Sequence, residues 1–146
     1  MIHILFVIIL LITGAIDAAT RKIHNISVIL ILLLAILRMI CDPTAIRSCI
    51  VGFFLLSVPM FLLALLRGGL GGGDIKLTAA CGLFLGVDTL LTGFLIAGSL
   101  ALASNFICHL YENWQRKRTP HAKMIHPRSF AFGPYLSIGF ILASFL

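Results

Sequence analysis

The chain has 146 residues, of which 60% are hydrophobic and 11% charged, and its mean hydropathy is +1.13. A soluble domain is about 45–50% apolar and about 25% charged. A water-soluble fold of this length could not bury so much apolar surface, so the lipid bilayer is the expected solvent. We therefore predict one membrane-embedded domain over residues 1–146, with no room for a separate soluble module.

Six apolar runs are candidate membrane-spanning helices, and they predict an all-α, polytopic fold. A span needs about 20 residues to cross roughly 30 Å of hydrocarbon. The third and fifth runs are long enough to do so, and the others are marginal or short. The break between the fourth and fifth runs, at Asp88, is weak, and a merged helix would leave five spans. The runs are Met1–Ile16, Ile26–Cys41, Ala45–Leu66, Ile75–Val87, Thr89–Leu110 and Phe130–Leu146.

The basic residues lie between the apolar runs and predict the orientation of the chain. Although the net charge is +6, this placement favours membrane topology over nucleic-acid binding. Nine of the 11 Lys and Arg residues lie in or beside the first, third and fifth connections. Such residues are enriched in cytoplasmic connections, so we expect these three in the cytoplasm and both termini outside. Arg38, near the outer end of its span, is expected to extend to the interface.

Two aspartates lie at the ends of predicted spans. Asp17 directly follows the first apolar run, and Asp74 directly precedes the fourth. The chain crosses the membrane twice between them, so both carboxylates are expected on the cytoplasmic side. If the first and fourth helices pack together, the pair can hold one water. Two close negative charges repel, so one carboxyl stays protonated while its partner acts as a base. Alternatively, each aspartate only caps a helix or lies at the interface, as we expect for Asp42 and Asp88.

A glycine-rich segment directly precedes Asp74. Glycines leave no side chain in the path of an extended peptide, as a protease that pairs with its substrate's main chain requires. We therefore predict that Gly71, Gly72, Gly73 and Lys76 form a substrate loop. For Lys76 two roles stay open, lowering the pKa of a carboxylate or contacting lipid phosphate. The glycines are Gly68, Gly69, Gly71, Gly72 and Gly73.

The four cysteines are scattered through apolar stretches, and no two of them form a Cys-x-x-Cys pair. The sequence also lacks a histidine–cysteine spacing typical of zinc sites. We interpret Cys41, Cys49, Cys81 and Cys108 as small packing residues rather than as disulfide partners or metal ligands.

Three stretches resemble the type IV prepilin peptidase family, especially its short form that serves Flp or tight-adherence pili. Asp17–Asn25 is similar to the family's aspartate followed by a basic stretch and Ile-Pro-Asn, and Gly71–Leu77 fits its Gly-x-Gly-Asp motif followed by Lys-Leu. Phe132–Tyr135 is similar to the Phe-Gly-Pro segment that opens the family's last helix. With six spans in order, the resemblance covers essentially the whole chain.

The resemblance implies a membrane aspartic endopeptidase of the bacterial inner membrane, with Asp17 and Asp74 as catalytic residues. Its substrates would be prepilins, whose short basic leader is cut after a glycine on the cytoplasmic side. No metal or cofactor is implied. Larger members carry a methyltransferase module with paired Cys-x-x-Cys motifs, which are absent here. The chain is therefore expected to cleave without methylating the product.

The chain departs from the family at His24, where proline is common, and we expect Asn25 or Ser27 to cap the second helix instead. Gly133 and Pro134 are expected to kink the start of the last helix, either to open room beside the active site or for packing alone. The basic segment Arg116–Arg128 is expected to be solvated and to face lipid, with pilin or the pilus-assembly machinery as alternative partners.

Other functions stay open at this stage. One is an archaeal preflagellin peptidase or another Gly-x-Gly-Asp intramembrane protease. A function of a different class is a small ion-coupled transporter or a non-catalytic pilus-assembly subunit. For a transporter we would expect aspartates nearer to mid-span.

Overall fold

The computed structural model describes residues 2–20, 24–67, 71–118 and 132–146. Over these ranges the chain is helical and contains no strand. The predicted order of six helices is confirmed for this part of the chain. The elements are α1 (Ile2–Thr20), α2 (Asn25–Cys41), the short 3-10 helix η1 (Pro43–Ala45), α3 (Ile46–Arg67), α4 (Gly72–Leu85), α5 (Val87–Arg118) and α6 (Gly133–Phe145).

Three segments are long and apolar enough to cross a membrane, namely Ile2–Thr20, Pro43–Leu66 and Val87–Tyr111. Helices α2 and α6 are apolar but shorter. Side chains exposed on the outside of the bundle are largely apolar, as a lipid solvent requires. The all-helical fold of a membrane protein is therefore confirmed, and six complete crossings stay a prediction.

The fourth and fifth helices are separate. Gly86, between them, has a φ of +80°, a conformation that L side chains rarely adopt. The amide of Val87 donates a hydrogen bond to the Ser48 hydroxyl of α3 over 3.0 Å, which ties the break to a neighbouring helix. The break thus lies just before Asp88, and the alternative of one merged helix is wrong.

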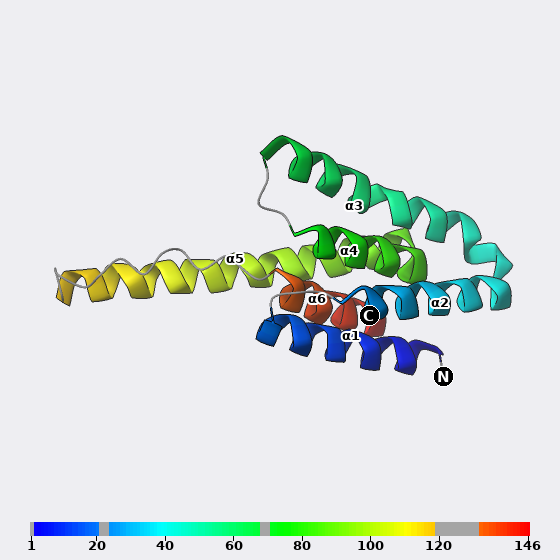
Figure 1. Cartoon of the computed structure of the whole chain (residues 1–146), viewed down its shortest axis with the longest axis horizontal. Helices are drawn as coiled ribbons and strands as arrows, with labels where there is room; N and C mark the ends of the chain where they lie inside the picture. The colour runs from blue at the N-terminus through cyan, green and yellow to red at the C-terminus, as the bar shows by residue number, and fades with distance from the viewer. Residues whose placement is uncertain (1, 21–23, 68–70, 119–131) are drawn as a thin grey trace.

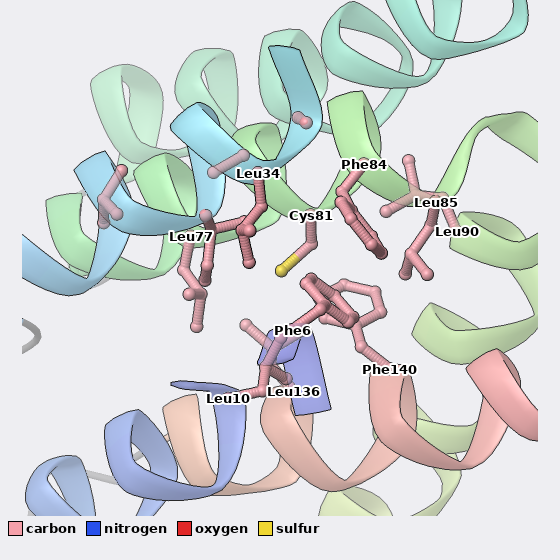
Figure 2. Packing of buried hydrophobic residues seen from close by; sticks show 14 of the residues in the cluster. Phe6, Leu10, Leu34, Leu77, Cys81, Phe84, Leu85, Leu90, Leu136 and Phe140 are labelled. Atoms are coloured by element: carbon pink, nitrogen blue, oxygen red, sulfur yellow. The ribbon is translucent and has the colours of Figure 1, made fainter. Parts of the chain in front are cut away.

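Helix α4 occupies the middle of the bundle, where it packs against α2, α3, α5 and α6. Unlike the other five α-helices, it has no large exposed hydrophobic side chain within the described residues. Its residues from Leu77 to Leu85 are almost all buried, and Phe84 stacks on Phe6 of α1 with ring centroids 4.1 Å apart. Figure 2 shows these two rings meeting Phe140 of α6 at the centre of the core. Protein therefore surrounds most of α4, and this helix need not be long enough to cross the bilayer by itself.

The ends of the helices fix where distant parts of the sequence meet. The end of α1 and the beginnings of α2, α4 and α6 lie at one end of the bundle (Figure 1). Helix α5 extends beyond this same end, whereas the turn from α2 to α3 lies at the other. The end of α1 and the beginning of α4 thus lie at one end of the bundle, as expected, and their side of the membrane stays a prediction. Helix α1, however, packs mainly on α6 and α2 rather than on α4.

Arg38 is half-buried and contacts the end of α4, and its extension to the interface stays a prediction. Its guanidinium donates a hydrogen bond to the carbonyl of Phe84 and lies 5.2 Å from the centre of that ring. The last carbonyls of a helix have no partner within the helix. Arg38 therefore caps the end of α4 from a neighbouring helix.

The four cysteines are free thiols. Cys49 and Cys81 are buried, which confirms a packing role for these two. Cys41 and Cys108 are exposed, so packing inside the core does not explain them.

Candidate active site

Asp17 lies in the last turn of α1 and Asp74 in the first turn of α4. Asp17 is only 5% exposed, and Asp74 is half-buried. The residue at the N-cap of α4 is Gly71, so the capping interpretation of Asp74 is wrong. A carboxylate near the C-terminal end of a helix is opposed by the helix dipole, so Asp17 gains nothing from its position in α1. Asp74, in the first turn of α4, is favoured by the dipole of that helix, whereas the position of Asp17 has no such structural explanation.

Both carboxylates lie against Gly133, the first residue of α6. A β-carbon added to Gly133 would overlap Asp17 Oδ2, and it would lie 2.8 Å from Asp17 Cγ and 3.4 Å from Asp74 Oδ1. The distance from Asp17 Cγ to Asp74 Oδ1 can therefore be no larger than the sum of the last two distances. One water can bridge two carboxyl groups at such a separation. The predicted meeting of Asp17 and Asp74 is confirmed, but it is brought about by the start of α6 rather than by direct packing of α1 on α4.

The protonation of the pair follows from its surroundings. Burial, with the added effect of the nearby Asp17 charge, raises the pKa of Asp74, which precedes the predicted fourth span, from 3.8 to about 6. When two carboxyls lie this close, loss of the first proton makes loss of the second harder. Near pH 6 the pair can therefore hold one proton, which is the state that combines an acid with a base.

The predicted substrate loop is partly helical, since Gly72 and Gly73 belong to the first turn of α4. A β-carbon at Gly71 would lie 3.3 Å from Asp74 Oδ2, whereas one at Gly72 would meet no atom within 4 Å. Gly73 is half-buried. Gly68 and Gly69 lie outside the described residues. Gly72 thus has free space beside it.

A cavity of about 570 Å³ separates α3 from the first turns of α4. Gly72 and Lys76, two of the four residues predicted to contact substrate, lie on its wall, and neither Asp17 nor Asp74 does. The wall consists of Phe61, Ala64, Leu65, Gly72, Ile75 and Lys76.

Lys76 is exposed, and its ammonium donates a hydrogen bond to Oδ1 of Asn25 over 3.3 Å. Asp74 has a raised pKa, so the first of the two roles left open for Lys76, lowering a carboxylate's pKa, is not supported at Asp74. His24 lies at the N-cap of α2 without a side-chain cap bond. The expected capping by Asn25 or Ser27 is therefore wrong.

The basic stretches flanking the site are only partly described. Arg21 and Lys22 lie outside the described residues, as do Lys123 and Arg128. The backbone of α5 continues through Arg118. The predicted lipid contact of the segment Arg116–Arg128 therefore stays a prediction.

Gly133 is the site residue that sequence reasoning identified least well. The Phe-Gly-Pro segment points to it, with packing alone as the alternative role. Its contact with both carboxylates favours the role beside the active site. Nothing in the local sequence indicates that the start of α6 lies between the ends of α1 and α4.

Comparison with known proteins agrees with this geometry. A model of the type IV leader peptidase family matches residues 4–105, a range that contains Asp17, the glycine segment and Asp74. Searches of curated proteins and of solved structures found no match. Because the family match covers well over half of the chain, the protein belongs to the type IV leader peptidase family.

Proposed function

We propose that the protein is an aspartic endopeptidase that removes the basic leader from type IV prepilins of the Flp kind. The observation that carries the proposal is the convergence of the Asp17 and Asp74 carboxyl groups on Gly133. Membership of a leader peptidase family supports peptidase activity. The two neighbouring carboxyls can supply an acid and a base, and hence the aspartic chemistry.

In the proposed mechanism one water lies between the two carboxyl groups. Asp17, ionised, accepts a proton from this water while the protonated Asp74 donates a hydrogen bond to the scissile carbonyl oxygen. The water oxygen then bonds to the carbonyl carbon while the Asp74 proton passes to the carbonyl oxygen, giving a tetrahedral diol. As the carbon–nitrogen bond breaks, the proton held by Asp17 passes to the leaving nitrogen. The proton taken up by the diol oxygen returns to Asp74, so the dyad regains its starting state.

The proposed site of cleavage is the cytoplasmic face of the bacterial inner membrane, directly after a glycine of the leader. The distribution of basic residues supports this placement, since the connections beside the two aspartates are the basic ones. The free space beside Gly72 supports the approach of a substrate main chain to the start of α4.

The geometry disfavours an ion-coupled transporter. Both aspartates lie in terminal helical turns at one end of the bundle, whereas coupling carboxylates are expected near the bilayer midplane. A preflagellin peptidase would use the same pair of acids, so the substrate decides between the two peptidase functions.

The test is co-expression with a candidate Flp-type pilin precursor from the same cell, followed by measurement of leader removal. Asp17→Asn and Asp74→Asn should each lower the cleavage rate by at least ~100-fold while membrane insertion persists. Asp88→Asn is the matched control, because this exposed acid lies at the start of α5, and it should process normally. Full processing by either dyad variant would refute the proposal.

A further inference from the structure

We propose that Gly133 is a positioning residue whose missing side chain lets the first turn of α6 hold the Asp17 carboxylate against Asp74. The inference rests on the proposed function, since it explains how the dyad is assembled. It assigns a role in that dyad to a residue outside the range matched by the family model.

The first step is the contact between α1 and α6, which run closely together along two successive turns. At one contact Gly14 of α1 faces Ser137 of α6, and a β-carbon at Gly14 would lie 2.9 Å from Ser137 Cβ. One helical turn farther along α1, Asp17 faces Gly133 of α6. Each turn therefore pairs a glycine on one helix with a side chain on the other. Close approach of two helices requires small residues at such places.

The second step is that α6 cannot move away from α1 to make room for a larger residue. On its other side α6 packs on α5, where a β-carbon at Gly139 would overlap the Gly93 carbonyl oxygen and lie 2.8 Å from the Ala97 amide nitrogen. The first turn of α6 is also closed, since Ser137 Oγ donates a hydrogen bond to the Gly133 carbonyl over 3.1 Å. Moving the start of α6 away from the dyad would therefore disturb its contacts with α5.

The third step is what a methyl group at Gly133 would displace. The nearest atoms are the carboxyl group of Asp17, the end of a side chain, whereas at Gly139 they include backbone atoms of α5. A side chain can rotate at much lower cost than a backbone can shift. Gly133→Ala should therefore leave the fold intact while turning the Asp17 carboxylate away from Asp74. A displacement of about 1 Å in an active site can cost roughly 100-fold in rate.

These steps define an experiment with a matched control on the same helix. Gly133→Ala, Gly139→Ala and Gly98→Ala are purified in detergent, and leader cleavage, thermal unfolding and the pH dependence of kcat/KM are measured. At Gly98 a β-carbon would meet no atom within 4 Å, so this variant should match the wild type in cleavage and in its pH profile, and its Tm should not fall.

For Gly133→Ala we expect kcat/KM to fall by on the order of 100-fold, with a Tm close to that of the wild type. The alkaline limb of its residual activity should move to lower pH, because Asp74 no longer feels a close Asp17 charge. Gly139→Ala should behave in the opposite way. Its Tm should fall, but kcat/KM per folded molecule should stay within about threefold of wild type with an unshifted pH profile.

Wild-type kcat/KM in Gly133→Ala would overturn the inference. So would a loss of folding in Gly133→Ala as large as that in Gly139→Ala, or an unshifted pH profile, because these results indicate packing alone. Failure of the proposed function is distinguishable, since it requires Asp17→Asn or Asp74→Asn to process normally. If both of these variants are inactive and Gly133→Ala is active, only the positioning role is refuted.

Discussion

The Lys76 ammonium donates a hydrogen bond to the side-chain oxygen of Asn25 over 3.3 Å, which joins the first turn of α4 to the start of α2. Asn25 closes the first family-like stretch of the sequence and Lys76 lies in the second. Lys76 and Asp74 are two positions apart on a helix and so do not face each other. The bond therefore fixes the first turn of α4, which carries Asp74, to its neighbour.

This contact predicts that Asn25→Ala and Lys76→Met each lower the free energy of unfolding by about 0.5–1.5 kcal/mol. The double variant should cost no more than one single change, because either substitution breaks the same bond. Lys76→Arg keeps a donor and a positive charge and serves as the control. Chemical unfolding in detergent measures the loss of unfolding free energy in the two single variants and in the double variant. Losses that add up in the double variant would mean that the two side chains do not interact.

The pH dependence of cleavage follows from the pKa of Asp74. Burial and the Asp17 charge raise this pKa to about 6, so the proton needed by the acid is lost as pH rises through that region. We expect kcat/KM to decline on the alkaline side with an apparent pKa far above the usual aspartate value of 3.8. Asp88→Asn should leave the profile unchanged. A profile that is flat from about pH 5 to about pH 8 would contradict the shared proton.

The position of the two acids could be predicted from the sequence because it depends only on the number of crossings between them. Two passages through the bilayer return the chain to one side wherever the helices pack. Which helices touch could not be predicted in this way. The first and fourth helices touch through Phe6 and Phe84, but their ends at the aspartates are bridged by α6, which packs closely on α5 at Gly93 and Gly139. Helical periodicity does not reveal which glycines face each other.

Arg38 shows the same limit for a single side chain. Its position near the end of an apolar run indicates an interface residue. The carbonyl that it binds belongs to Phe84, which is distant in sequence and comes close only because α2 packs on α4. The central position of α4 in the bundle could not be predicted either. A short apolar run is compatible with a locally thin membrane as well as with a helix buried in protein.

Gly72 provides a test of the predicted substrate loop. A methyl group at this position meets no protein atom within 4 Å, so Gly72→Ala should fold normally and gain about 0.4–1 kcal/mol from reduced freedom of the unfolded chain. If a substrate main chain approaches here, the methyl should raise KM for the precursor with little change in kcat. Gly98→Ala, equally open but located in α5, is the matched control. Unchanged KM in Gly72→Ala would remove this residue from the substrate site.

His24 departs from the family's usual proline, yet its backbone already has the conformation of a proline. Its φ is −73° and its ψ is 132°, and proline fixes φ at about −65° with a spread of roughly 15°. As the N-cap residue of α2, His24 makes no side-chain cap bond that a substitution would remove.

His24→Pro should therefore stabilise the protein by about 0.4–1 kcal/mol, because it restricts the unfolded chain without straining the folded one. For a chain of this length the gain corresponds to a rise in Tm of roughly 1–4 °C. Cleavage should be unchanged, since no described contact joins His24 to the dyad. His24→Ala is the control, because it removes the imidazole without restricting φ. A lower Tm in His24→Pro than in His24→Ala would mean that the start of α2 needs freedom or an amide hydrogen at this position.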